Sequence, residues 1–187
     1  RKLLQKLVEE GKLVDLGIVE VKNIFERNGG EVIWFKLSPH LSSANLKNSI
    51  LSESNFRAAD LRDANLQMTD LSKAYLQWAN LQGANLSNSN LNSAFLEMAN
   101  LKNAKLQNAD LQHANLGSAN IVEANLSEAN LKKVTLTQVN GQKANFQKAD
   151  LSETYIYKAD FSGANFKDSR LIHAFLEKVN FENSFFQ

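Results

Sequence analysis

The sequence contains no cysteine, a single proline and no long apolar run. The lack of cysteine excludes disulfides, thiolate nucleophiles and cysteine-ligated metals. No stretch approaches the roughly 18 apolar residues that a membrane-spanning helix needs. Charge of one sign is not in excess either, since 21 Lys and Arg face 20 Asp and Glu in 187 residues, so the total charge indicates no electrostatic partner.

The one proline, Pro39, marks a change of composition. Before it, residues 3–8 show apolar side chains at helical spacing, residues 22–30 end in two glycines that would close a short helix, and residues 31–37 are rich in strand formers. We expect residues 1–38 to be a short α/β capping segment or the remnant of an upstream region, and residues 39–187 to form the main unit. The chain begins with Arg1, so a signal peptide could have been removed, and a cytoplasmic location is only the default expectation.

From Ala44 to the C-terminus the chain repeats every five residues without an insertion or deletion. We call the central apolar position i; it runs from Leu46 to Phe186 and holds 20 Leu, six Phe, two Ile and Gly141. Position i−2 is usually Ala, i−1 is Asn or Asp in 20 of 29 repeats, and i+1 and i+2 are mostly polar. A period of five fits neither a helix nor a simple strand, so it indicates a solenoid whose units bury their apolar face by stacking. Positions i and i−2 share parity and point the same way in an extended segment, and the chain must then turn before the next repeat.

Segments such as SANL, DANLQ, GANLS, NADLQ, EANLS and GANFK resemble the A(D/N)LXX signature of the pentapeptide repeat family. The resemblance covers roughly residues 40–187, about four fifths of the chain. It implies an all-β fold, a right-handed quadrilateral β-helix of about seven coils, in which four repeats make one 20-residue coil. At roughly 4.8 Å per coil, the rod would be about 34 Å long. We name its four sides after their first central residues, as the Leu46, Leu51, Phe56 and Leu61 sides.

Phenylalanine occurs at position i only near the ends of the repeat region. The 20-residue period predicts two Phe ladders in the C-terminal coils, and a wider core there, from residues 146, 166 and 186 on one side and 161 and 181 on the next. Gly141 is the one central position without a side chain. We predict a local bulge or small cavity at this position, partly filled by Val134 and Val139.

A regular solenoid without loop insertions offers no concave site with convergent polar groups, and no phosphate-binding glycine loop or zinc-protease motif is present. We therefore expect no enzyme activity, no cofactor and no metal site. His113 and His173 share a side but lie three coils, about 14 Å, apart, and we interpret them and His40 as surface residues. The columns of Asn and Asp at i−1 are interpreted as turn-stabilising ladders rather than as a binding row.

Some proteins of the family that this chain resembles mimic DNA and act on type II topoisomerases, which requires a strongly negative surface. Over residues 41–187, the Leu61 side carries three basic and five acidic residues, and the Leu46 side carries four basic and two acidic residues. The Leu51 side carries four basic and five acidic residues, and the Phe56 side carries three basic and two acidic residues. The sum is zero, and no side has the dense charge of one sign that DNA mimicry or nucleic-acid binding would need. The sequence thus predicts a non-enzymatic scaffold that binds an unidentified protein and no nucleic acid. A DNA-mimicking topoisomerase modulator is the alternative.

Aromatic residues replace Asn at i−1 mainly on the Phe56 side, at four of seven positions against one of 22 elsewhere. The candidate protein-binding face consists of the large side chains that project from this side: Tyr75, Trp78, Phe95, Met98, Tyr155, Tyr157 and Phe175. Grouped apolar surface of this kind often marks a contact. Two alternatives remain, namely cross-strand stacking that only stabilises the sheet, or cover by part of residues 1–38.

The C-terminal end of the rod is a second candidate surface. A solenoid end exposes strand edges and core side chains and needs a cap. No capping helix is seen after Phe186, and the alternative to an open end is that the sequence stops before its cap. Because proteins of this family often pair end to end, the resemblance implies a homodimer through Phe181, Phe185 and Phe186. At the other end, we expect residues 31–37 to join or cap the first coil.

Overall fold

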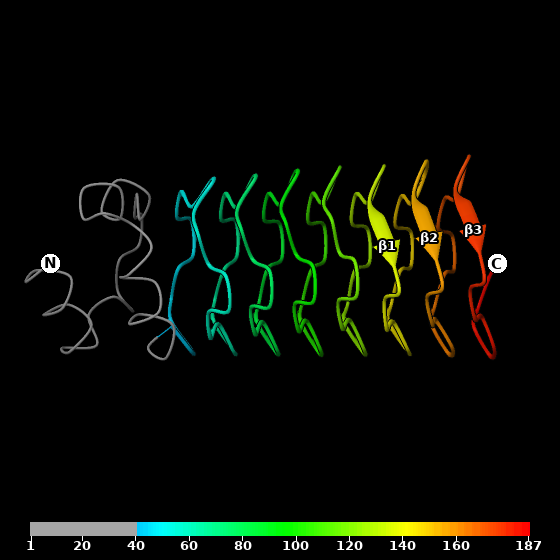
Figure 1. The fold of residues 1–187 in the computed structure, drawn as a ribbon, viewed down its shortest axis with the longest axis horizontal. Coiled ribbons are helices and arrows are strands. Elements are labelled where there is room, and N and C mark those ends of the chain that lie inside the picture. The colour runs from blue at the N-terminus through cyan, green and yellow to red at the C-terminus, as the bar shows by residue number, and fades with distance from the viewer. Residues whose placement is uncertain (1–40) are drawn as a thin grey trace, which may run out of the picture.

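The computed structural model describes residues 41–187, which form a rod of stacked coils (Figure 1). The helices, strand and capping role predicted within residues 1–38, and His40, lie outside the described residues. Parallel bridges join residues 20 apart, from Asn45 with Asn65 to Asn165 with Phe185. Because 20 residues hold four repeats, every coil has four sides, as the quadrilateral β-helix predicts. The number of coils and the wider C-terminal core stay predictions.

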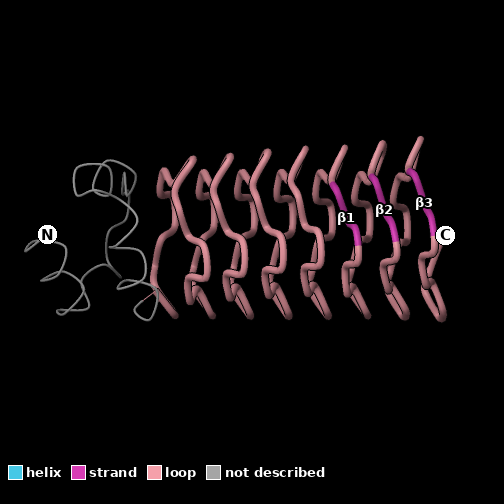
Figure 2. Tube along the Cα trace, viewed as in Figure 1, coloured by secondary structure: helices cyan, strands magenta, loops and turns pink. Residues whose placement is uncertain are grey.

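Three bridges on the Phe56 side extend into short strands, β1 (Thr135–Thr137), β2 (Tyr155–Tyr157) and β3 (Phe175–Glu177). They form a parallel sheet in the order β1-β2-β3. β-Branched and aromatic residues are concentrated here, and both favour extended backbone. Residues 41–187 otherwise consist of turns and single bridges (Figure 2), so this part of the chain has no helix that could cross a membrane.

The chain turns in every repeat through a residue with left-handed backbone conformation. The residue at i+2 has φ between +55° and +70° in all repeats from Ser43 to Asn183, and only Gly83 and Gly163 among these residues are glycine. In most repeats the N–H of the next i−2 residue donates to the carbonyl of residue i, as Ala44 does to Leu41 at 3.1 Å, which closes a tight turn. A left-handed conformation costs a non-glycine residue roughly 1 kcal/mol or more, so the stacking of coils must offset this cost at nearly every corner.

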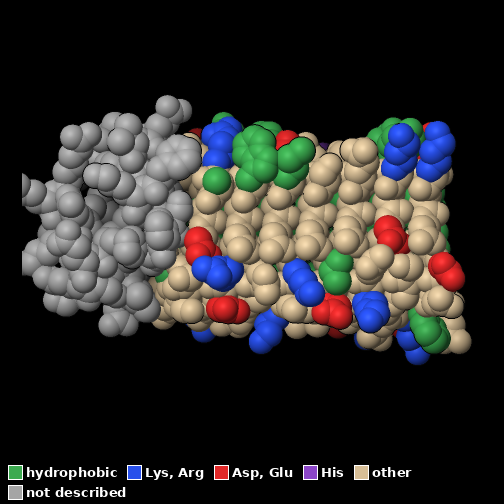
Figure 3. Space-filling view, turned by 60° about the horizontal axis from the view of Figure 1, so that its bottom comes forward, with side chains coloured by type: hydrophobic (Ala, Val, Ile, Leu, Met, Phe, Trp, Pro, Cys, Tyr) green, Lys and Arg blue, Asp and Glu red, His purple; other side chains and the backbone are tan. Residues whose placement is uncertain are grey.

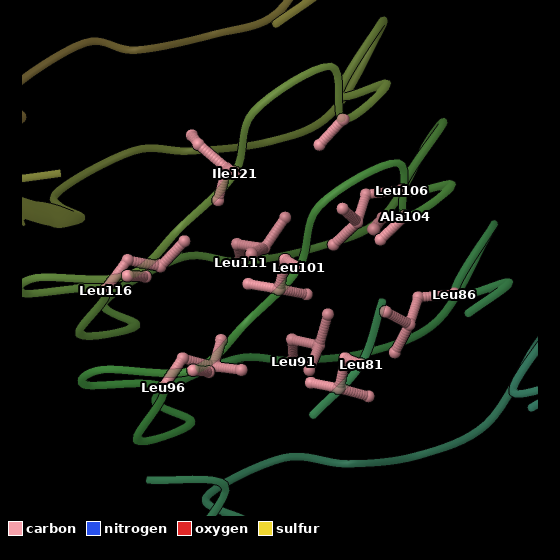
Figure 4. Close-up of a cluster of buried hydrophobic side chains, with 14 of the residues drawn as sticks. Leu81, Leu86, Leu91, Leu96, Leu101, Ala104, Leu106, Leu111, Leu116 and Ile121 are labelled. Atoms are coloured by element: carbon pink, nitrogen blue, oxygen red, sulfur yellow. The ribbon is translucent and has the colours of Figure 1, made fainter. Parts of the chain in front are cut away.

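The core is a column of Leu side chains, with Ala at i−2 closing the corners (Figure 4). Each central residue with a side chain, from Leu46 to Phe166, is at most 1% exposed, which confirms the inward assignment of position i. Where Thr replaces Ala at i−2, its hydroxyl donates to a backbone carbonyl, as Thr69 does to Leu46 at 2.9 Å. The hydroxyl is therefore buried at little cost.

Both predicted Phe ladders are confirmed. Phe146, Phe166 and Phe186 stack with ring centroids 4.8 and 4.9 Å apart and nearly parallel planes. Phe161 and Phe181 form the second ladder, with centroids 6.0 Å apart and planes 23° apart. The two ladders meet edge to face, so the aromatic rings fill the C-terminal coils in a favourable geometry.

The predicted bulge or cavity at Gly141 is wrong. The N–H of Gly141 donates to the carbonyl of Asp160 at 2.7 Å and its carbonyl accepts from Ala144 at 3.1 Å, as in the repeat that follows. A Cβ at this position would collide with Cδ1 and Cε1 of the Phe161 ring, one coil further on. The ring of Phe161 therefore fills the space that a side chain at Gly141 would occupy. A ring that leans in this direction also agrees with the wider and more tilted stacking of Phe161 on Phe181.

Candidate protein-binding surface

Side chains at i−1, i+1 and i+2 project from the rod, because i and i−2 point inward. The structure places the aromatic i−1 residues of the Phe56 side in two register pairs, Tyr75 with Phe95 and Tyr155 with Phe175. Asn115 and Thr135 follow Phe95 in the same column and precede Tyr155. The predicted face is therefore interrupted, and its seven residues divide into two patches.

The N-terminal patch consists of Tyr75, Trp78, Phe95 and Met98. The rings of Tyr75 and Phe95 stack with centroids 5.1 Å apart and planes 6° apart, and the guanidinium of Arg57 lies 4.2 Å from the Tyr75 ring centre. Trp78 and Met98 occupy the same turn position in successive coils, and the Trp78 indole Nε1–H donates to the Met98 sulfur at 3.0 Å. Both side chains stay 57% and 56% exposed, so the patch is ordered by its own contacts and still open to a partner.

The C-terminal patch consists of Tyr155, Tyr157 and Phe175 on strands β2 and β3. Tyr155 stacks on Phe175 with centroids 4.9 Å apart, and Tyr155 and Tyr157 lie 6.5 Å apart. Two ammonium groups flank Tyr157, with Nζ of Lys158 and Lys178 at 5.1 and 5.6 Å from the ring centre. Figure 3 shows two groups of hydrophobic side chains along one edge of the rod, separated by polar atoms, with basic side chains beside the C-terminal group.

Stacking within each patch is what a purely stabilising role predicts, and both ring pairs are cross-strand neighbours. Stacking of the i−1 rings does not explain the exposed apolar area of Trp78 and Met98, which lie at the corner of the rod. The other alternative, cover by part of residues 1–38, lies outside the described residues. The assignment of these seven residues to a binding face stays a prediction.

Glu97 lies beside the N-terminal patch, between Phe95 and Met98 in the sequence, and was not predicted as part of the surface. Its Oε1 accepts a hydrogen bond from Nδ2 of Asn115 at 2.7 Å. Its Oε2, and Oε1 of Gln77 one coil earlier, are buried without a hydrogen-bond partner among residues 41–187. Buried acceptors that lack a donor are costly and uncommon. The available signal was that Glu97 is the one acidic residue in the N-terminal aromatic stretch of this side.

The C-terminal end presents a further apolar surface. Outside the C-terminal patch, the exposed apolar residues of the last coil are Ile172, Leu176, Phe185 and Phe186, and Phe185 is 67% exposed. Phe181 is only partly exposed because it packs against the core. Two of the three predicted dimer residues are therefore exposed, and the partly buried Phe181 meets Phe186 edge to face, with ring centres 5.3 Å apart.

The Asn and Asp residues at i−1 serve the fold, as interpreted from the sequence. Oδ1 of Asn145 accepts from the backbone N–H of Gln147 at 3.1 Å. Nδ2 of Asn145 donates to Asn125 at 3.2 Å, and Nδ2 of Asn165 donates to Asn145 at 3.1 Å. Each amide therefore holds its own turn and links two coils, which confirms the ladders.

The perturbed acidic groups lie away from both patches. A hydrogen bond from Arg62 lowers the pKa of Asp60. Partial burial alone would raise the pKa of Asp150, but hydrogen bonds from Ser152 and from Lys132 outweigh it, and the pKa is lowered overall. No group of three or more His, Asp or Glu side chains able to hold a metal ion is present in residues 41–187.

The repeat region is similar to a known protein family and to several solved structures. The family model for pentapeptide repeats matches overlapping segments that together run from residue 40 to residue 183. HetL, a pentapeptide repeat protein involved in heterocyst differentiation regulation from the cyanobacterium Nostoc sp. strain PCC 7120, is 31% identical over 74% of this chain and 68% of its own, with a TM-score of 0.41. No curated protein matches the chain.

Two other solved structures are similar. Rfr23, a pentapeptide repeat protein from the cyanobacterium Cyanothece 51142, is 33% identical over 50% of this chain and 64% of its own, with a TM-score of 0.49. The present chain thus spans less than two thirds of the length of Rfr23. QnrB1, a plasmid-mediated fluoroquinolone resistance protein, is 18% identical over 79% of this chain and 84% of its own, with a TM-score of 0.61. At that identity the likeness to QnrB1 concerns the fold alone.

Proposed function

The chain belongs to the pentapeptide repeat family, whose members form right-handed quadrilateral β-helices, and from that premise we propose that it is a non-enzymatic scaffold that binds another protein through its Phe56 side. Proteins of this family are generally structural or interaction proteins. Solenoids present long, regular surfaces to partners, and stiffness comes from the continuous core.

The observation that carries this proposal is the grouping of exposed apolar side chains on one side of the rod, whereas Ile50, Met68 and Ile172 are exposed singly on other sides. Trp78 and Met98 are more than half exposed, and Tyr155 and Phe175 are 45% and 46% exposed. Aromatic residues and Met are enriched at protein interfaces, and aromatic side chains supply large apolar area with little loss of side-chain entropy. A grouped apolar surface on a polar rod is a better candidate for recognition than scattered single residues.

The alternative, a DNA-mimicking modulator of a type II topoisomerase, has less support. Residues 41–187 carry 14 basic and 14 acidic residues, spread over all four sides. A surface that competes with DNA for a protein needs dense negative charge, which no side offers. A gyrase supercoiling assay tests this alternative: protection or inhibition at micromolar protein would favour DNA mimicry over the scaffold.

Affinity capture from the native source tests the scaffold. The variant carries Tyr75→Asn, Trp78→Asn and Phe95→Asn, which introduce the residue that the repeat itself prefers at i−1 and that tolerates the left-handed turn. We expect a normal circular dichroism spectrum and melting temperature but loss of the captured partner. The matched control, Ile50→Asn with Met68→Asn, removes exposed apolar side chains at the same repeat positions on other sides. Capture that survives the triple substitution, or that fails equally with the control, would contradict the proposed face.

We further propose that the C-terminal end forms a homodimer through Phe181, Phe185 and Phe186. The exposed rings of Phe185 and Phe186 would be buried against a second copy, and apolar burial is the main favourable term in association. Light scattering coupled to size exclusion should give a dimer for the native chain and a monomer for Phe185→Asn with Phe186→Ser. The control Phe95→Asn should stay dimeric, and a native chain that is monomeric at high concentration would refute the dimer.

A further inference from the structure

We propose that the partner segment on the Phe56 side is extended and acidic, with a large apolar side chain seated on Trp78 and Met98 and carboxylates at Lys158 and Lys178. This inference rests on the proposed function and names the chemistry of the partner. It follows from three properties of the two patches: their polarity, their unequal charge and their separation along the rod.

The apolar end of the site is the corner formed by Trp78 and Met98. The indole and the thioether lie in successive coils and are held together by the hydrogen bond from Trp78 Nε1 to Met98 Sδ. Because this bond uses the one polar group of the indole, the remaining exposed area of both side chains is apolar. Such a surface favours an aliphatic or aromatic side chain of the partner over a polar one.

The basic end of the site is formed by Lys158 and Lys178. Both ammonium groups lie within 6 Å of the Tyr157 ring centre. Lys178 also lies 3.4 Å from a carboxylate oxygen of Glu177, whereas no carboxylate within the described part of the chain lies at ion-pair distance from Lys158. The residues beside the C-terminal patch therefore carry two positive charges against one negative charge. Its excess charge complements an acidic segment of a partner, and apolar surroundings strengthen the attraction.

The separation between the two ends sets the spacing of the partner's side chains. Residues 78, 98, 118, 138, 158 and 178 occupy the same turn position in successive coils, so they form one straight column along the rod. At roughly 4.8 Å per coil, Lys158 lies about 14 Å from Met98 and about 19 Å from Trp78. An extended chain advances roughly 3.3 Å per residue, so the apolar residue and the first acidic residue are about four to six positions apart, with about three to five residues between them. Between the two ends the column holds only Ser118 and Gln138, over which a peptide backbone can pass.

A nucleic acid is the other polyanion that lysines and aromatic rings could attract. Strands of DNA or RNA are bound by long rows of basic residues that follow the phosphates. The whole Phe56 side carries three basic and two acidic residues, and one of its two clustered lysines already contacts a carboxylate. These numbers favour a protein segment with a few carboxylates over a continuous phosphate backbone.

Fluorescence anisotropy with synthetic peptides tests the inference on the full chain. The labelled peptides carry a leucine–phenylalanine pair, a serine–threonine spacer of roughly two to eight residues, and two glutamates. We expect the tightest binding at spacers of about three to five residues, and about tenfold weaker binding when lysines replace the glutamates. The pair Lys158→Glu with Lys178→Glu should reverse this charge preference, and Trp78→Asn should weaken binding of either peptide.

The matched control is Lys143→Glu with Lys148→Glu, two exposed lysines at the same turn position on other sides, which should leave binding unchanged. No binding at millimolar peptide, equal binding of acidic and basic peptides, or no dependence on spacer length would overturn the inference. So would tighter binding of a single-stranded oligonucleotide that the Lys158 and Lys178 changes abolish. If affinity capture depends on the triple substitution while the acidic peptides fail, the face is right and the partner chemistry is wrong. If capture is indifferent to that substitution, the proposed function fails first.

Discussion

Replacing Gly141 by alanine should lower the free energy of unfolding by about 1–2 kcal/mol. The added Cβ would meet the ring of Phe161 at a distance that no native packing allows, so the ring or the backbone must move. Overfilling a close-packed core costs about 1–3 kcal/mol. Part of that cost is offset, because the φ of Gly141 is not in the left-handed region and alanine restricts the unfolded chain by about 0.4–1 kcal/mol.

A double-mutant cycle isolates the contact between the two residues. In a Phe161→Leu background the ring is gone, so Gly141→Ala should be neutral or slightly stabilising. The coupling free energy between the two positions should therefore be about 1–3 kcal/mol, as expected for residues in direct contact. Urea unfolding followed by far-UV circular dichroism measures all four proteins.

Gly117→Ala is the matched control. A Cβ at Gly117 would meet only the Asn115 side chain at 3.3 Å and lie 3.9 Å from its next neighbours, at a surface position with ordinary φ. Its effect should stay within about 0.5 kcal/mol. If Gly141→Ala changes stability equally in both backgrounds, the Phe161 ring does not occupy the space above Gly141 and the core is packed differently at this coil.

Three further outcomes follow from the backbone and its polar side chains. The free energy of unfolding should fall as the pH drops below about 4, because the lowered pKa of Asp150 means that the unfolded state binds more protons than the folded state in this range. In urea unfolding at several pH values, Asp150→Asn should make the free energy of unfolding less dependent on pH. An unchanged pH dependence in this variant would contradict the role of Asp150. In the same assay, Asn145→Ala should lower the free energy of unfolding by about 1–3 kcal/mol. Asn145→Asp should lower it less, because Asp, unlike Ala, keeps an oxygen that accepts the hydrogen bond of the turn. Equal losses of stability in the two variants would argue against the ladder. Gly163→Ala should lower the free energy of unfolding by about 1 kcal/mol, and with it the melting temperature, because its φ of +68° is costly for alanine. A new Cβ there would lie 3.4 Å from its nearest neighbour, so no collision adds to this cost, and an unchanged melting temperature would show that the corner tolerates any residue.

Most of the fold could be predicted because the period of five is unbroken. Once residues 20 apart are neighbours, the stacking of Phe146 on Phe166 follows from arithmetic, as does the pairing of Tyr75 with Phe95. Period alone does not give the direction in which a side chain leans. For that reason the sequence predicted a void at Gly141, where the ring of Phe161 reaches back and fills it.

The sequence predicted that the seven side chains share one side of the rod, but not how they are arranged there. Counting i−1 aromatics selects the Phe56 side, but it treats them as one surface, whereas Asn115 and Thr135 separate two patches. The bond between Trp78 and Met98 depends on rotamers at a left-handed corner, which the repeat does not specify. Neighbouring side chains bury one carboxylate oxygen of Glu97 without a hydrogen-bond donor. The polarity pattern of the repeat places Glu97 on the outer surface and does not predict this burial.

Because residues 20 apart pair without interruption, the length of the rod and the direction in which a side chain projects both change in fixed steps. Removing one whole coil between the two patches would bring them about 4.8 Å closer and leave them on the same side. Removing a single five-residue repeat would instead turn everything beyond it by a quarter revolution, so that the lysines and the indole face different directions. Insertions and deletions of repeats therefore change the distance between the patches and their relative direction in fixed steps. A partner that contacts both patches at once would still bind only after the insertion or deletion of whole coils.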